Sequence, residues 1–222
     1  MNENRDIEIE ITADGSATLY VKSLDEHYHS VKGAIAESNH IYRDCAFLHR
    51  SDGTSLRLLE IGFGTGLNAA VTAMAANAQH PTHYITLEKY PITEALYTAL
   101  DYGKLVDSQL LEKIYKAPWD TPTAITPHFT LEKRHADYLV DTLPDGIDVV
   151  YFDAFAPEKQ PEMWSELAFR RLYESLNRGG VLTTYCAKGS IRRLLTEIGF
   201  SVERISGPLG GKREILRATK HI

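Results

Sequence analysis

The stretch LRLLEIGFGTG, from Leu56 to Gly66, decides the fold. A compact apolar run ends at Glu60, and glycines follow at positions 62, 64 and 66. The apolar run predicts a buried strand, and glycines after a first strand let the backbone turn sharply and approach a ligand closely. Good helix formers fill residues 67–78. We therefore expect a strand–turn–helix unit at the ligand-binding edge of an α/β sheet.

The rest of the chain repeats this alternation of strands and helices. Further strands are expected at 83–90, 128–134, 146–153 and 181–187, and helices at 91–100, 161–176 and 190–200, with a helical stretch and a Pro-rich loop between 101 and 126. Strands that alternate with helices specify a parallel sheet covered on both faces. The last two strands, 200–206 and 213–219, are separated by a Gly-Pro-Leu-Gly-Gly turn, which permits an antiparallel hairpin.

This pattern favours an α/β fold of the class I S-adenosylmethionine (SAM) methyltransferase kind over a standard dinucleotide fold. The expected core is Rossmann-like, a mostly parallel seven-stranded sheet with an antiparallel C-terminal hairpin. Before it, residues 7–21 alternate apolar and polar around Asp14-Gly15, a strong hairpin signal, and a helical segment follows. We expect an N-terminal extension at 1–53 and a methyltransferase domain at 54–222.

Composition sets limits on function. The 222 residues are 43% hydrophobic, enough for one sizeable core. The net charge of -6 argues against a broadly basic nucleic-acid-binding surface, although a local patch stays open. The two cysteines show no metal-ligand spacing, and His27 and His29 have no ligand partners nearby in sequence, so no metal is expected. A polar N-terminus and the lack of a 20-residue apolar run predict a cytoplasmic protein without a membrane span.

The glycine segment follows a G-x-G-x-G spacing. It lacks both the G-x-G-x-x-G of dinucleotide sites and the Gly-Lys-Ser/Thr ending of phosphate loops. Glu60 would repel a pyrophosphate, whereas it suits the ammonium and sulfonium of SAM. The alternative is a tight turn that holds no ligand. The cofactor-binding candidates of this segment are Glu60, Gly62, Phe63, Gly64, Gly66 and Asn68.

Two further acids stand where later strands end. Glu88 lies some 20 residues past the glycines and has the position of an acid that accepts hydrogen bonds from ribose hydroxyls. Asp137 follows the third strand and would face the adenine amino group. The alternatives are an exposed charge for Glu88 and a helix N-cap for Asp137. Their neighbours Lys89 and Ala136 join the cofactor-binding candidates.

The segment YFDAFAPEKQPEMW, residues 151–164, ends the fourth strand in a carboxylate. Ligands of open α/β sheets bind outside the carboxyl ends of the strands, so Asp153 would face both the SAM methyl group and an acceptor. A carboxylate suits an amine acceptor because it holds an ammonium and takes up a proton. Phe155 is a candidate for stacking on a planar base. The alternative is that Asp153 caps the next helix and Phe155 packs in the core.

Basic residues gather near two strand ends. Lys188, Arg192 and Arg193 form one group, and Lys212, Arg213 and Arg217 the other. Most such runs are solvated faces. If both lie beside Asp153, they would form a phosphate-binding patch that the net charge conceals.

Together these motifs resemble a known family. DGSATLY, EHYHS-x-x-GA-x-x-ES, LEIGFGTGLN, DAFAPEKQPEMW, TTYCAKG and GKREILRA are similar to the bacterial tRNA 5-methylaminomethyl-2-thiouridine methyltransferases (MnmC/MnmD type). The resemblance spans nearly the whole chain, and the DAFAP segment is its most specific part. It implies methyl transfer from SAM to the exocyclic amine of 5-aminomethyl-(2-thio)uridine at the tRNA wobble position, with the anticodon stem-loop as partner.

The resemblance also assigns residues. The glycines would cradle SAM, Glu88 would bind ribose, Asp137 the adenine side, and Asp153 and Phe155 the acceptor. The substrate-binding set would be Glu37, Phe155, Tyr185, Lys188, Arg192, Lys212 and Arg213. Two-domain relatives carry a FAD-dependent oxidase; this sequence shows no second Gly-rich strand–turn–helix, which implies a methyltransferase acting alone.

Two other functions stay open at this point. One is a small-amine methyl- or aminopropyltransferase, polyamine-like and of the same fold. The other is a non-catalytic SAM-binding partner subunit. Oligomeric state does not follow from the sequence.

Overall fold

The computed structural model describes residues 6–50, 53–211 and 213–221. Within these ranges the chain forms an eight-stranded sheet and a three-stranded sheet. The large sheet has the order β10-β11-β9-β8-β4-β5-β7-β6. Its strands are β4 (Leu56–Ile61), β5 (Thr82–Glu88), β6 (Thr123–Thr126), β7 (Phe129–His135), β8 (Ile147–Phe152), β9 (Leu176–Thr184), β10 (Phe200–Ser206) and β11 (Glu214–Lys220).

The pairing of these strands confirms the predicted fold class. β4 is parallel to β5 and β8, β5 to β7, and β8 to β9. β11 inserts antiparallel between β9 and β10. In the described residues the large sheet has eight strands, one more than the seven predicted, because β6 pairs antiparallel with β7 at the edge. Pro122 and Pro127 flank β6, and prolines of this kind are tolerated beside an edge strand.

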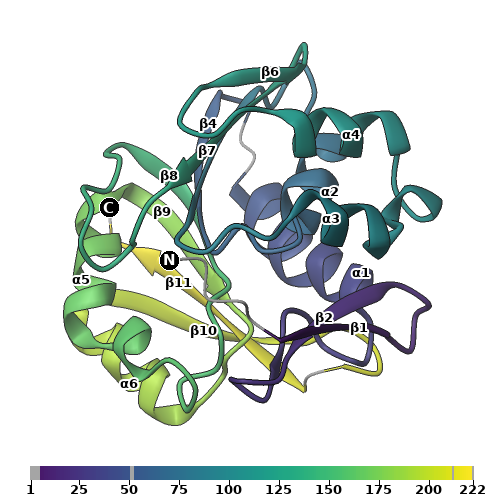
Figure 1. Cartoon of the computed structure of the whole chain (residues 1–222). Helices are drawn as coiled ribbons and strands as arrows, with labels where there is room; N and C mark the ends of the chain where they lie inside the picture. The colour runs from purple at the N-terminus through teal and green to yellow at the C-terminus, as the bar shows by residue number, and fades with distance from the viewer. Residues whose placement is uncertain (1–5, 51–52, 212, 222) are drawn as a thin grey trace.

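Helices cover both faces of the large sheet (Figure 1). One face carries α2 (Leu67–Ala75), α3 (Glu94–Leu100), the 3₁₀ turn η2 (Tyr102–Lys104) and α4 (Ser108–Lys116). The other carries the 3₁₀ turn η3 (Pro161–Trp164), α5 (Glu166–Ser175) and α6 (Gly189–Ile198). Because side chains alternate along a strand, Leu58 packs with the first group and Leu59 with the second. No helix in the described ranges is long and apolar enough to cross a bilayer.

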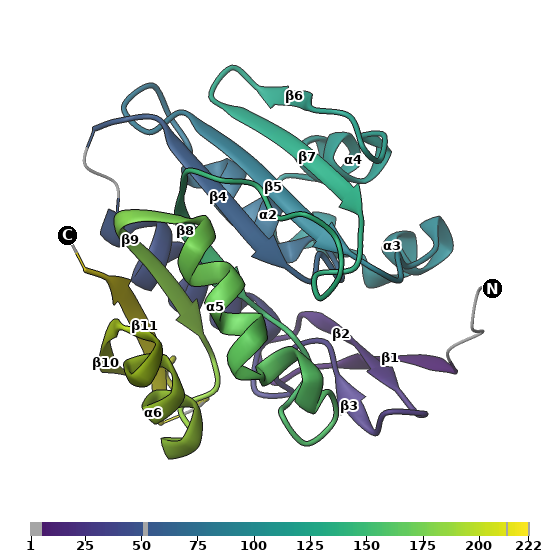
Figure 2. The ribbon, with the colours of Figure 1, turned by 90° about the vertical axis from the view of Figure 1, so that its left-hand side faces the viewer.

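The N-terminal hairpin forms as predicted. β1 (Ile7–Ile11) pairs with β2 (Ala17–Val21) around Asp14-Gly15, and β3 (Glu26–His27) adds a short third strand. The Asp14 carboxylate accepts a hydrogen bond from the N–H of Ala36 over 3.0 Å, which joins the hairpin turn to the helix that follows. Figure 2 shows this small sheet beside the end of the large sheet at which the arrowheads of β4 and β5 point.

The helical segment after the hairpin packs on the large sheet. It consists of α1 (Ala34–Glu37) and a π-helix, η1 (Ser38–Leu48), which contacts α2, β8, β9 and β11. Ile41, Tyr42 and Phe47 of η1 are buried in the same core as α2. The extension therefore supplies part of the core of residues 54–222, and the boundary after residue 53 remains a prediction.

Candidate functional site

A cavity of about 290 Å³ opens at the carboxyl ends of the central strands. The turn after β4 contributes Gly62, the last residue of β5 is Glu88, and the loop after β8 contributes Asp153. Residues 26–31 of the N-terminal segment form another wall. The cavity thus lies where the sequence predicted a ligand, with the small sheet closing one side of it.

The glycine turn needs glycines for its conformation and for space. Gly62, Gly64 and Gly66 have φ of 90°, 50° and 74°, a region that other residues rarely adopt. A Cβ on Gly62 would lie 3.1 Å from the carbonyl oxygen of Asp153, and one on Gly64 would lie 2.9 Å from the ring of Tyr28. Gly62 and Gly64 line the cavity, whereas Gly66 packs against Phe63 behind it.

Glu88 is held at the cavity wall by two backbone groups. Its Oε2 accepts from the N–H of Gly64 over 3.1 Å, and its Oε1 accepts from the N–H of Tyr90 over 2.8 Å. A carboxylate oxygen can accept more than one hydrogen bond. Glu88 can therefore accept further hydrogen bonds from a ligand in the cavity. A fixed carboxylate of this kind fits a pair of neighbouring hydroxyls, such as those of a ribose.

Lys89 and Asp137 form an ion pair at the same wall, with Nζ and Oδ2 2.7 Å apart. Burial pulls the pKa of Asp137 upward, but the Lys89 ammonium and the N–H of Leu139 outweigh it and leave the pKa below its usual value. Asp137 also accepts a hydrogen bond from the N–H of Leu139, but a turn and not a helix follows it, so it does not act as a helix N-cap. Its side chain closes this turn and lines the cavity. Ala136 lines the cavity beside it.

Asp153 stands at the junction of three elements. Tyr42 of η1 donates its hydroxyl hydrogen to Oδ1 over 2.7 Å, and Nδ2 of Asn68 at the start of α2 donates to Oδ2 over 2.8 Å. The backbone N–H of Asp153 bonds to the carbonyl of Ile61, which ties the end of β8 to β4. The carboxylate is therefore fixed in position at the cavity rather than used as a helix cap.

Aromatic side chains surround this carboxylate. The ring of Phe155 meets that of Tyr28 edge-to-face, with centroids 5.1 Å apart, and both line the cavity. Tyr185 also lines it and donates its hydroxyl hydrogen to the carbonyl of Ala154 over 2.9 Å. Nε1 of Trp164 donates to the carbonyl of Phe155 over 2.8 Å. These two bonds fix the DAFAP loop, so Phe155 faces the cavity instead of the core.

Glu60 lies beneath the cavity, because its side chain points from β4 toward α2. It is fully buried, and neither carboxyl oxygen has a hydrogen-bond partner among the described residues. Burial, together with the negative charge of Asp153, raises the pKa of Glu60 to about 8, although the polar groups of Thr86, Tyr84 and Asn68 partly oppose this. Glu60 therefore shares a buried polar cluster with Asn68 and does not itself line the cavity.

Glu60→Gln is expected to stabilise the ligand-free protein at neutral and higher pH. With a folded pKa of about 8 against 4.5 when unfolded, the folded state holds the extra proton between these values. The wild type therefore loses stability as pH rises through this window, by about 1.4 kcal/mol per pH unit at most, and the glutamine variant does not. Melting temperatures from pH 5 to 8.5 test this: a constant difference between the two proteins would contradict it.

The charge of the cavity suits a cation. Its lining contains the carboxylates of Glu26, Glu37, Glu88, Asp137 and Asp153 against a single lysine, Lys89. Oδ1 of Asn68, another lining residue, is buried and has no hydrogen-bond partner among the described residues. An adenosine bearing a sulfonium and an ammonium fits this surrounding better than a phosphate does.

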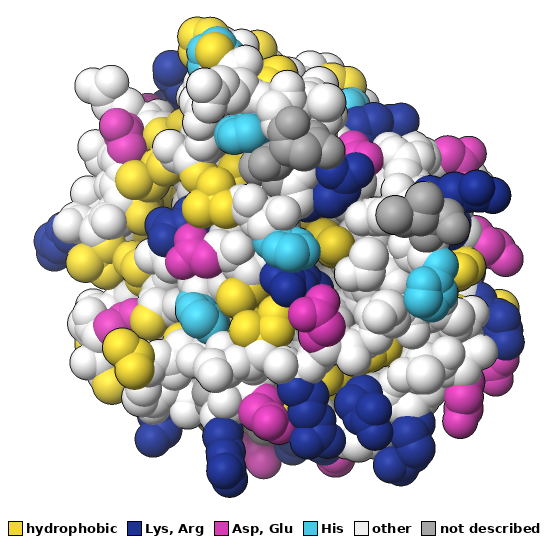
Figure 3. Space-filling view, turned by 180° about the vertical axis from the view of Figure 1, so that it is seen from behind, with side chains coloured by type: hydrophobic (Ala, Val, Ile, Leu, Met, Phe, Trp, Pro, Cys, Tyr) yellow, Lys and Arg dark blue, Asp and Glu magenta, His cyan; other side chains and the backbone are white. Residues whose placement is uncertain are grey.

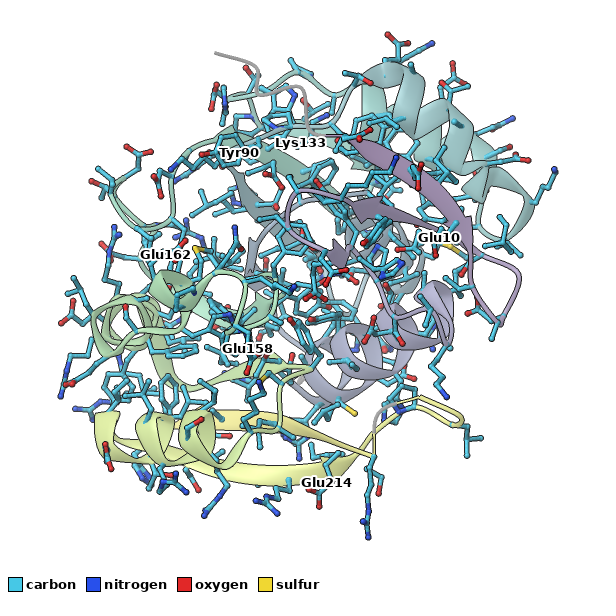
Figure 4. All side chains as sticks on the ribbon, turned by 60° about the horizontal axis from the view of Figure 1, so that its bottom comes forward. Glu10, Tyr90, Lys133, Glu158, Glu162 and Glu214 are labelled. Atoms are coloured by element: carbon cyan, nitrogen blue, oxygen red, sulfur yellow. The ribbon has the colours of Figure 1, made fainter. Side chains whose placement is uncertain are left out.

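Those predicted basic residues that the structure describes lie outside the cavity lining. Lys188 pairs with Glu158, which Figure 4 shows on the loop that follows β8. Arg192 is half-buried and Arg213 is exposed, while Lys212 lies outside the described residues. Figure 3 shows lysine and arginine side chains interspersed with acidic ones along the lower edge of one face. A phosphate-binding patch beside Asp153 therefore remains a prediction.

Most predicted site residues meet at this one cavity. They are Glu37, Gly62, Phe63, Gly64, Asn68, Glu88, Lys89, Ala136, Asp137, Asp153, Phe155 and Tyr185. Sequence reasoning missed Tyr28, which covers the glycine turn, and Tyr42, which holds Asp153. The EHYHS motif around Tyr28 is the sequence feature that could have indicated Tyr28 as a site residue. In the same motif, Nε2 of His29 lies 2.7 Å from Oγ1 of Thr65 and forms a hydrogen bond with it.

Comparison with known proteins agrees with this geometry. Residues 125–221 match the model of a family described as S-adenosyl-L-methionine-dependent methyltransferase. The crystal structure of MnmC2 from Aquifex aeolicus superposes with a TM-score of 0.74 at 29% identity, over 97% of this chain and 71% of that one. Spermidine synthase from Thermotoga maritima superposes with a TM-score of 0.62 at 15% identity, over 97% and 69%, which shows a shared fold.

Two relatives found by sequence similarity carry the same protein name. The tRNA 5-methylaminomethyl-2-thiouridine biosynthesis bifunctional protein MnmC of Cupriavidus necator is 32% identical over 217 residues, 90% of this chain and 32% of the relative. The protein of that name from Actinobacillus pleuropneumoniae is 27% identical over 234 residues, 95% of this chain and 35% of the relative. The chain thus spans about a third of the length of these relatives.

Fold, cavity and comparisons define a class I SAM-dependent methyltransferase, with SAM as its cofactor. Within that class, the chain is similar to the methyltransferase region of MnmC, which its motifs also resemble.

Proposed function

We propose that the protein transfers a methyl group from SAM to the exocyclic amine of 5-aminomethyl-(2-thio)uridine at the tRNA wobble position. The anticodon stem-loop is then its macromolecular partner, and the cytoplasm its place of action. The observation that carries the proposal is the fixed carboxylate of Asp153 beside Phe155 at the cavity. A carboxylate next to an aromatic ring suits an acceptor that joins an amine to a planar base. The names of the relatives narrow that acceptor to a precursor of 5-methylaminomethyl-2-thiouridine in tRNA. The motif resemblance implies the wobble position.

In this proposal the residues divide between two ligands. Gly62, Gly64, Glu88 and Asp137 hold SAM, and the sulfonium of bound SAM supplies an electrophilic methyl group. Phe155 stacks on the extruded base. This stacking offsets part of the free energy that unstacking the base costs, roughly a few kcal/mol. Asp153 would hold the protonated amine and accept one proton from its nitrogen, which frees the nitrogen lone pair. That lone pair would form the bond to the methyl carbon as the carbon–sulfur bond of SAM breaks, with S-adenosylhomocysteine as the leaving group. Positioning of the nitrogen supplies much of the rate gain.

The test is incubation with labelled SAM and undermodified tRNA, followed by nucleoside analysis. We expect label in 5-methylaminomethyl-(2-thio)uridine. Label in a polyamine instead would favour the small-amine transferase, and SAM binding without transfer to either acceptor would favour a non-catalytic subunit. The 15% identity to a spermidine synthase reflects the fold alone and does not support the first rival.

A further inference from the structure

The carboxylate of Asp153 is held by a side chain from the N-terminal extension. Tyr42 is 111 residues away in sequence, yet its hydroxyl lies 2.7 Å from Oδ1. Only 1% of Tyr42 is exposed, and it does not line the cavity. Its ring packs against that of Tyr151 on β8, with centroids 5.1 Å apart. Tyr42 thus reaches Asp153 from behind and cannot itself touch a ligand in the cavity.

Both oxygens of Asp153 accept a hydrogen bond, one from Tyr42 and one from Asn68. Protonation would place a hydrogen on an oxygen that already faces a donor, so this arrangement favours the ionised carboxylate. Burial, with the charge of Asp153, raises the pKa of Tyr42 well above its usual value. Tyr42 therefore remains a neutral donor throughout the physiological pH range.

The other ionisable groups near this carboxylate act in the opposite direction. The groups that interact electrostatically with Asp153, Tyr42 or the adjoining Tyr185 include Glu26, Glu37, Glu60, Tyr84 and Cys186. All of them are acids, and any negative charge among them disfavours a further one on Asp153. Glu60 and Tyr84 stay neutral at slightly acidic pH, because burial raises the pKa of each. The two donors act against that effect, because each donates to an oxygen of the ionised carboxylate.

We propose that Tyr42 is a positioning residue for methyl transfer, which orients Asp153 and keeps it ionised to receive the acceptor amine. This inference rests on the proposed function, in which Asp153 binds that amine. It also gives the N-terminal extension a part in the chemistry, because the extension supplies a residue on which the acceptor site depends. Asn68 holds the second oxygen, so Tyr42 governs one of the two bonds that set the plane of the carboxylate.

The experiment compares Tyr42→Phe with Tyr151→Phe. Both substitutions keep the ring and delete one buried hydroxyl, but the Tyr151 hydroxyl lies 3.0 Å from Thr72 Oγ1 rather than beside Asp153. Two quantities are measured: the carboxyl-carbon NMR titration of Asp153 in the protein alone, and the pH dependence of kcat/KM for tRNA methylation. We expect Tyr42→Phe to move the Asp153 titration and the acidic limb of kcat/KM to higher pH. At slightly acidic pH its kcat/KM should fall about tenfold, the effect of losing one hydrogen bond to a charged group.

Tyr151→Phe should leave both pH dependences unchanged, although each variant should melt at a lower temperature than wild type. An unmoved Asp153 titration in Tyr42→Phe, or an equal shift in both variants, would overturn the role of Tyr42. If wild-type protein does not methylate undermodified tRNA, the proposed function fails. The NMR titration still decides whether Tyr42 keeps Asp153 ionised, since it requires no acceptor.

Discussion

Asp153→Ala should lower the turnover of tRNA methylation by about a hundredfold or more, the usual contribution of a positioned acid or base. The carboxylate is fixed by Tyr42 and Asn68 at the cavity, and the proposed mechanism has no other group that takes the proton of the amine. SAM affinity should change by no more than about threefold, because the glycine turn and Glu88 remain. A threefold change corresponds to less free energy than one hydrogen bond to a charged group contributes. Isothermal calorimetry with SAM and single-turnover methylation of undermodified tRNA measure the two quantities separately.

Asp148→Ala is the matched control. Asp148 lies on β8, the strand that Asp153 directly follows, at the end away from the cavity. It accepts hydrogen bonds from the N–H of Arg57 and from Nδ2 of Asn177. Asp148→Ala, like Asp153→Ala, therefore removes a carboxylate that accepts two hydrogen bonds. The turnover of tRNA methylation should stay at the wild-type level in Asp148→Ala. Near-wild-type turnover in Asp153→Ala would show that the acceptor role belongs to another residue.

Glu88→Ala should weaken SAM binding by about one to two orders of magnitude, because hydrogen bonds to a charged group are worth about 1.5–3 kcal/mol each. The change removes a carboxylate that fits the ribose hydroxyls and also releases the N–H groups of Gly64 and Tyr90. At saturating SAM, the turnover should approach that of wild type, since Asp153 is untouched. Calorimetry with SAM and turnover at increasing SAM concentration provide the test.

Glu132→Ala serves as its control. Glu132 is a mostly buried carboxylate on the neighbouring strand β7, paired with His83 and Arg134, and it does not line the cavity. Its replacement should leave SAM affinity unchanged. Equal weakening by both substitutions would indicate a general loss of structure rather than a ribose contact at Glu88.

The parts of the site that follow from strand order were predictable from sequence. Glu88 ends one parallel strand and Asp153 directly follows another, and the carboxyl ends of such strands meet at one edge. The glycine spacing after β4 likewise indicated where a ligand would approach. Each of these inferences needs only the periodicity of a strand and the position of a turn.

Contacts between distant segments were not predictable in this way. Tyr42 and Asp153 meet because η1 crosses β8, and the packing angle of a helix on a sheet leaves no local trace in sequence. The position of Tyr28 over Gly64 depends likewise on how the small sheet docks. Glu60 is a different case, because strand alternation alone places its side chain on the Leu58 side, toward α2 rather than in the cavity.

The insertion of β11 between β9 and β10 constrains the order in which the protein is assembled during synthesis. β10 precedes β11 in the chain, yet among the described strands it pairs with β11 alone. As the polypeptide leaves the ribosome, β10 therefore emerges with no partner, and the outer edge of β9 stays open until residues 214–220 arrive. Unpaired strand edges of this kind promote association between nascent chains. The central strands that build the SAM cavity are thus available to fold earlier than the edge that protects the sheet from aggregation.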